Sequence, residues 1–75
     1  MFLQNIFCER LRALRKQRNM SQATLGAAIG VSKVQISDIE LGNRTTTIEK
    51  LVVLADILDV SLDYLVGRSD DPERR

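Results

Sequence analysis

The sequence predicts an all-α domain built from five helices. Only Phe2, Phe7 and Tyr64 are aromatic, so a core has to be assembled from Leu, Ile, Val and Ala, which favours packed helices over a sheet. The apolar residues recur at helical spacing in five segments that are bounded by Ser, Thr, Asn or Gly. We expect residues 1–67 to form one domain. The charged segment 68–75 has no apolar side chain to bury, and we expect it to be disordered.

The first two helices have recognisable ends. Residues 6–18 carry an apolar stripe, and Asn19 follows it. Ser21 is a favourable N-cap for a second helix, and Gly30 permits the left-handed backbone at which a helix ends. The residues expected to face inward from these two helices are Phe7, Leu11, Leu14, Leu25, Ala28 and Ile29.

The third helix has the clearest start. Ser32 is its predicted N-cap, and Gln35 stands three residues later, where it completes a capping box. Gly42 ends the helix. The spacing of Ile36 and Ile39 predicts that both face the core.

Two further helices complete the fold. Thr46 or Thr47 caps the fourth, and the sequence leaves both open. Ser61 caps a short fifth helix that ends at Gly67. The apolar residues expected to face the core from these two helices are Ile48, Leu51, Leu54, Ala55, Leu58, Leu62, Leu65 and Val66.

Residues 22–41 have the pattern of two short helices that cross through a tight turn. The crossing needs a very small side chain in the first helix, and Gly26 supplies it. The turn needs a residue that tolerates a positive φ, which Gly30 does, and the next residue, Val31, must be buried. These demands are met over twenty residues, so we predict a helix-turn-helix at 22–41.

The charge is distributed unevenly along the chain. The net charge is only +1, which is low for a nucleic-acid-binding domain. However, five basic residues against one acidic give +4 over residues 1–18, and four against seven give −3 over residues 45–75. A domain that presents one face to phosphates is expected to have such a basic and an acidic end.

Several classes of function are disfavoured. The chain has no histidine and one cysteine, Cys8, so we expect no metal site, no disulfide and no cofactor, with Cys8 as a small core residue. There is neither a catalytic cluster nor a phosphate-cradling glycine loop, so we predict that the protein is not an enzyme. No effector site is evident. Residues 1–7 are too short for a signal peptide and no apolar run reaches the roughly 20 residues of a membrane span, so we expect a cytoplasmic protein.

The string SQATLGAAIGVSKVQISDIELGNR, at residues 21–44, resembles the helix-turn-helix of the phage-repressor/Cro (Xre) family of bacterial and phage regulators. The resemblance extends through VSLDYLVG and covers roughly residues 7–67. It implies a compact five-helix, lambda-repressor-like fold, in a protein that is usually a dimer and has no enzymatic activity. It also implies that the third helix lies in the major groove and that the protein represses or activates promoters.

The resemblance assigns roles to residues around the third helix. Gln22 matches a glutamine that typically contacts a phosphate and braces the first base-reading residue. Asn43 and Arg44 match a loop that commonly grips phosphates. Arg15 and Glu40 match a pair that ties the first helix to the third. The chain departs from the family pattern in having Gly26 for the usual alanine and Leu41 where relatives have a polar or basic residue.

The recognition helix, residues 32–41, supplies the predicted base readers. The residues that match its exposed face are Ser32, Lys33, Val34, Ser37 and Asp38. Lys33 can donate to guanine O6 and N7, and Val34 can pack on a thymine methyl group. Asp38 either accepts from cytosine N4 or makes no contact, whereas Ser37 can bond a base edge or a phosphate. Ser32 positions the domain on the DNA backbone, and Gln35 either touches DNA or acts only in the capping box.

The sequence leaves two interpretations open for the dimer interface and two for the function. Val53 and Ile57 lie at i, i+4 off the core stripe of the fourth helix, and Phe2, Leu3 and Tyr64 are further candidates for an interface. The alternative is that these residues thicken a small core. The leading hypothesis is a homodimer that binds an inverted-repeat operator in double-stranded DNA as a transcriptional regulator, with repression as the expected effect. The alternative is a protein-interaction module of the same fold, such as an antitoxin or adaptor.

Overall fold

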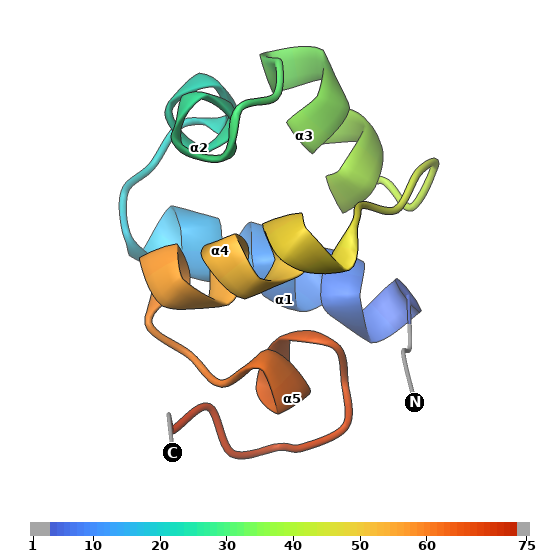
Figure 1. Ribbon diagram of the computed structural model, residues 1–75, viewed down its shortest axis with the longest axis vertical. Coiled ribbons are helices and arrows are strands. Elements are labelled where there is room, and N and C mark those ends of the chain that lie inside the picture. The colour runs from blue at the N-terminus through green and yellow to red at the C-terminus, as the bar shows by residue number, and fades with distance from the viewer. Residues whose placement is uncertain (1–3, 74–75) are drawn as a thin grey trace.

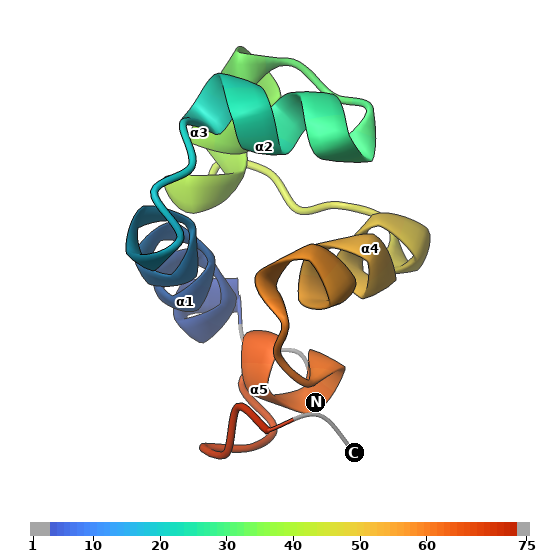
Figure 2. The ribbon, with the colours of Figure 1, turned by 90° about the vertical axis from the view of Figure 1, so that its left-hand side faces the viewer.

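The computed structural model describes residues 4–73, and over this range it is all-helical, as predicted (Figure 1). The five helices are α1 (Gln4–Gln17), α2 (Gln22–Ile29), α3 (Lys33–Glu40), α4 (Ile48–Leu58) and α5 (Leu62–Leu65). The interface candidates Phe2 and Leu3 lie outside the described residues. Helices α2 and α3 lie at one end of the molecule and α5 at the other, with α1 and α4 between them (Figures 1 and 2).

The helix starts follow the predicted capping chemistry. The side chains of Ser21, Ser32, Thr47 and Ser61 each accept a hydrogen bond from the backbone N–H three residues later. Thr47, and not Thr46, therefore caps α4. A serine or threonine oxygen at this position satisfies one of the backbone donors that a helix leaves unpaired at its start.

The crossing of α2 and α3 depends on two glycines. A Cβ atom on Gly26 would lie 2.7 Å from the carbonyl oxygen of Val31, so only hydrogen fits there without a backbone shift. Gly30 ends α2 with a φ of 78°, in the left-handed region that costs glycine little. Both predicted roles are met, and α2 and α3 consequently pack closely against each other.

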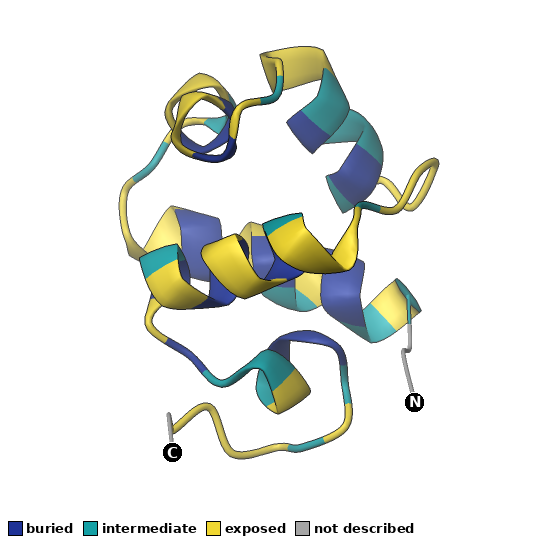
Figure 3. Cartoon of the chain, viewed as in Figure 1, coloured by how far each residue is buried: buried dark blue, intermediate teal, exposed yellow. Residues whose placement is uncertain are grey.

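The core lies between the inner faces of the helices (Figure 3). Its largest fully buried side chains are Phe7, Leu11, Leu25, Ile36, Ile39, Leu54, Leu58 and Leu65. Two predictions about it were wrong: Ala28 is exposed, and Ile48 is 64% exposed. Ile48 is the first residue of α4 and lies in an open hollow shared with Leu62 and Val66. Val60, in the link between α4 and α5, is buried without having been predicted.

The expectation that residues 68–75 are disordered stays a prediction, and residues 74–75 lie outside the described residues. Residues 68–73 follow a defined path back across α5, although they bury no large apolar side chain. The Arg10 guanidinium donates to the carbonyl oxygens of Tyr64 at 2.5 Å and Ser69 at 2.6 Å, and it pairs with Asp70 at 2.9 Å. Polar contacts hold this segment, and hydrophobic periodicity carries no signal for such contacts.

Candidate nucleic-acid interface

Helix α3 has two opposite faces. Ile36 and Ile39 are fully buried and fasten the helix to the core. Lys33 and Val34, in its first turn, are exposed, and Val34 is 68% exposed. Ser37 and Asp38, one turn later, are half-buried, and Leu41 follows as another exposed apolar residue. The outward face therefore combines a cation, apolar groups and short polar side chains on a rigidly anchored helix.

The capping box at the start of α3 is complete. The Gln35 backbone N–H donates to Ser32 Oγ at 3.1 Å, and the Ser32 backbone N–H donates to Gln35 Oε1 at 2.9 Å. The amide nitrogen of Gln35 has no partner among residues 4–73. Gln35 thus has the structural role that the sequence left open, and its amide remains a free donor beside the outward face.

Arg15, Glu40 and Gln22 form one polar network that joins α1, α2 and α3. Arg15 Nε and Nη2 donate to the two oxygens of Glu40 at 2.6 and 3.1 Å, and Gln22 Nε2 donates to Glu40 Oε1 at 3.2 Å. Arg15 Nη1 also donates to the carbonyl of Met20 at 2.8 Å. The hydrogen bond to Glu40 raises the pKa of Arg15, so the guanidinium keeps its charge.

Gln22 does not make one contact that the family resemblance implies, which is the bracing of the first base-reading residue of α3. Its side chain is hydrogen-bonded to Glu40 and not to a residue in the first turn of α3. An amide nitrogen carries two N–H groups, and the bond to Glu40 uses one of them. Gln22 is therefore held at the start of α2 with a second donor still available.

The loop after α3 is exposed on both sides of Arg44. The Asn43 backbone N–H donates to the carbonyl of Asp38 at 2.9 Å, which ties the loop to the last turn of the helix. Neither the Asn43 amide nor the Arg44 guanidinium has a side-chain partner within residues 4–73. Both groups can therefore meet an external anion beside the recognition helix.

Cys8 is a buried core residue, as expected. Its thiol donates to the carbonyl of Ile39 at 3.0 Å, so it lies at the contact between α1 and α3. Burial raises the pKa of the Cys8 thiol, which keeps it protonated and unreactive at neutral pH.

The proposed interface residues on α4 and α5 are not equally accessible. Val53 is 39% exposed, whereas Ile57 and Tyr64 are half-buried and pack against the core. The Arg10 guanidinium also covers the Tyr64 ring, 4.0 Å from its centroid. The most exposed apolar residues of α4 are Ile48, which the periodicity placed in the core, and Val52, which it did not single out.

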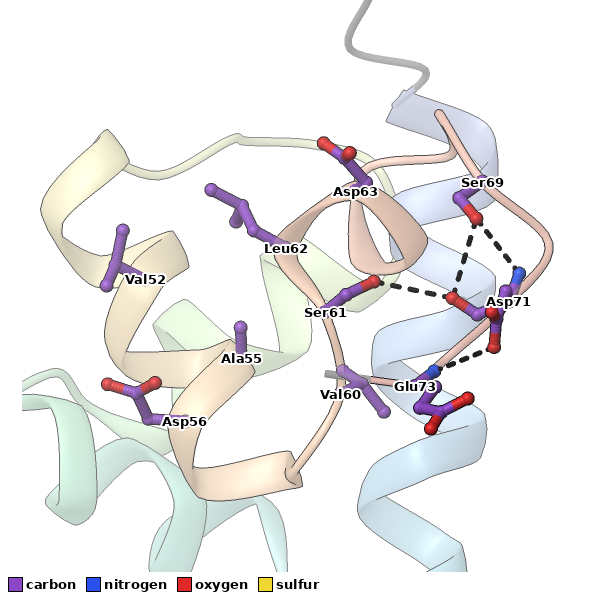
Figure 4. A pocket seen from close by; sticks show the side chains of 10 residues that line it. All are labelled: Val52, Ala55, Asp56, Val60, Ser61, Leu62, Asp63, Ser69, Asp71 and Glu73. Carbon is purple, nitrogen blue, oxygen red and sulfur yellow. Dashed lines mark hydrogen bonds between the residues drawn. The ribbon is translucent and has the colours of Figure 1, made fainter. Parts of the chain in front are cut away.

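The surface of the described residues is hollowed near α5. One hollow of about 510 Å³ lies between α4, the start of α5 and the final segment (Figure 4). Its polar lining consists of four acidic side chains and two serines, whose hydroxyls donate to the carbonyl of Asp71: Asp56, Asp63, Asp71, Glu73, Ser61 and Ser69. Within the described residues no group of side chains is arranged to hold a metal ion. In the same range no helix has the length and apolar character that a membrane crossing requires.

Comparisons with known proteins agree with this geometry. A helix-turn-helix family model matches residues 11–65. The chain is 38% identical over 68 residues to YobD, an HTH-type transcriptional regulator of Bacillus subtilis, covering 91% of this chain and 61% of YobD. The chain thus spans less than two thirds of the length of that relative.

Solved structures give the same fold. The c2 repressor of Salmonella phage P22, in complex with a synthetic operator, matches with a TM-score of 0.79 and 39% identity, over 85% of this chain and 97% of that chain. Hydroxypropylphosphonic acid epoxidase from S. wedmorenis matches with a TM-score of 0.76 and 26% identity, over 84% of this chain but 34% of the epoxidase. The family model and the repressor likeness agree on the arrangement around α2 and α3. The chain belongs to the helix-turn-helix family of phage-repressor and Cro type.

Proposed function

We propose that this domain binds double-stranded DNA sequence-specifically as a transcriptional regulator, with α3 in the major groove. The observation that carries the proposal is the outward face of α3, where Val34 is 68% exposed beside Lys33. A valine gains nothing from exposure to water. On the floor of the groove it meets thymine methyl groups, while the adjacent ammonium reaches guanine O6 and N7.

The surrounding residues suit contacts with the DNA backbone. Ser32 and Gln35 lie at the start of α3, where the helix dipole favours an anion. Asn43 and Arg44 lie in the loop beyond the helix, and Gln22 lies at the start of α2. Such contacts position a domain on DNA without reading sequence. We assign Ser37 and Asp38 to the base-reading face, where Asp38 accepts from a cytosine amino group.

We further propose that the protein is a repressor and acts in the cytoplasm. The likeness to the P22 c2 repressor, which was crystallised on an operator, supports this choice. A domain that occupies an operator can repress by excluding other proteins, and it needs no catalytic site to do so. We therefore propose a binding protein and not an enzyme, even though the fold also forms part of an epoxidase chain.

A homodimer on an inverted repeat completes the proposal. Val53 is exposed on α4, close along the helix to Val52 and Ile48, which together offer apolar area to a second copy. Ile57 and Tyr64, being half-buried, would contribute only their outer edges. A two-fold axis through this face has to place the two copies of α3 about 34 Å apart, one turn of DNA. Sedimentation at micromolar concentration tests this step, and a monomer there contradicts it.

Selection of bound duplexes from a random pool tests the main proposal. We expect an inverted repeat, and we expect Lys33→Ala and Val34→Ala to change the selected sequence. Arg44→Ala should instead weaken all sequences about equally, because a phosphate contact carries no sequence information. Arg68→Ala, which removes the same charge at the opposite end of the molecule, should do neither. If Lys33→Ala preserves both affinity and preference, α3 does not read DNA as proposed.

A further inference from the structure

Val34 and Asp38 are neighbours on the outward side of α3. They stand four residues apart, so their Cβ atoms are about 5–6 Å from each other and both side chains can reach one base or two adjacent bases. Val34 is 68% exposed and Asp38 is half-buried. The buried side chains of Ile36 and Ile39 fasten the opposite side of the helix to the core, which holds the pair in place.

The Asp38 carboxylate restricts what this face can bind. Within residues 4–73 it has neither a hydrogen bond nor an ion pair, so no internal cation neutralises it. Phosphates repel a carboxylate, and an amino group on a base edge is the donor that can offset this repulsion in the major groove. Adenine carries the acceptor N7 beside its amino group, whereas cytosine carries only the carbon C5 there. The carboxylate therefore favours cytosine.

Val34 needs an apolar partner within reach of the same place. Among the four ordinary bases only thymine has a methyl group in the major groove, and the O4 beside it is an acceptor that repels Asp38. On unmodified DNA the two side chains therefore have to take their contacts from two different bases. A cytosine methylated at C5 differs, because its amino group and its methyl group are attached to neighbouring ring atoms on one edge.

We propose that Val34 and Asp38 together read a 5-methylcytosine, so that methylation of the operator strengthens binding. The inference rests on the proposed DNA-binding function and adds a chemical mark that regulates it. The added methyl group lies where thymine has its own, so it packs on Val34 while the amino group still donates to Asp38. Burial of this methyl group should raise the affinity about fourfold.

The test starts from a random duplex pool in which 5-methylcytosine replaces every cytosine. In the selected half-site, each methylcytosine is changed in turn to cytosine, which lacks the methyl group, or to thymine, which has a carbonyl in place of the amino group. At one position the wild-type protein should bind about fourfold more weakly with cytosine and about tenfold more weakly with thymine. Val34→Ala should abolish the first difference and keep the second, whereas Asp38→Ala should do the reverse.

Asp63→Ala is the matched control, because it removes an exposed carboxylate from α5, at the other end of the molecule (Figures 1 and 2). It should keep both differences. Circular dichroism checks that the variants are folded, as expected for side chains outside the core. If no methylcytosine shows both differences, or if the two variants act at different bases, the shared reading is refuted while DNA binding stands. Selection that succeeds only with unmodified DNA also refutes it. If neither pool yields a bound duplex, the proposed function itself fails.

Discussion

Glu40→Ala should be among the most destabilising substitutions of a polar residue in this domain. The Glu40 side chain is 4% exposed and that of Arg15 is 11% exposed, so the pair is removed from water. The substitution deletes both acceptors of Arg15 and the acceptor of Gln22. It leaves a buried guanidinium with only the Met20 carbonyl as a partner. Breaking one side of such a pair costs about 3–5 kcal/mol.

That loss is large for a chain of this size. Cores of small domains rarely supply more than about 3–5 kcal/mol of net stability, so the variant should be near its unfolding midpoint at room temperature. Urea unfolding followed by circular dichroism measures the change. Glu9→Ala, which removes an exposed glutamate from α1, should change the free energy of unfolding by less than about 0.5 kcal/mol.

A double variant separates the buried charge from the loss of packing. Arg15→Met with Glu40→Leu removes both charges and fills their space, so it should recover most of the stability that Glu40→Ala loses. A loss for Glu40→Ala below about 1 kcal/mol, the value of an exposed pair, would refute the reasoning. So would a double variant that is as unstable as the single one.

Three further predictions concern other parts of the fold. Gly30→Ala should cost about 1–2 kcal/mol in urea unfolding, because the backbone has a φ of 78° while no atom blocks the new Cβ; no loss would contradict this conformation. Arg10→Ala should speed trypsin cleavage after Arg68, since the guanidinium holds the final segment; unchanged cleavage would show that the segment is held otherwise. The free energy of unfolding should fall above about pH 8.5, because the raised pKa of Cys8 favours the protonated thiol of the folded state. Cys8→Ala should show a smaller fall, and an equal fall would assign it to other groups.

The helices and their starts could be predicted from the sequence because capping and periodicity are local. Ser21, Ser32 and Ser61 accept hydrogen bonds three residues ahead, so the information lies within one turn. Capping preference cannot distinguish Thr46 from Thr47, because the hydroxyl of either residue could accept the hydrogen bond that caps α4. Ile48 was misplaced because periodicity gives the face of a helix but not how far the neighbouring helices extend.

For the candidate site, the sequence could predict only which side chains of α3 are exposed, because exposure follows from helical spacing. Lys33 and Val34 are exposed at the start of α3, as their spacing against Ile36 and Ile39 implied. The hydrogen bond between Gln22 and Glu40 depends on how α2 packs against α3, which no local pattern contains. The contacts of Arg10 with the final segment span more than fifty residues and likewise required the structure.

The most direct test of DNA reading by α3 is the affinity for uracil-substituted duplexes. Uracil lacks only the methyl group of thymine, so replacing thymines one at a time probes the apolar contact proposed for Val34. At one thymine of each half-site, the wild-type protein should lose affinity while Val34→Ala loses none. Equal losses for the two proteins at every thymine, or no loss for either, would contradict the placement of α3 in the major groove with Val34 against the bases.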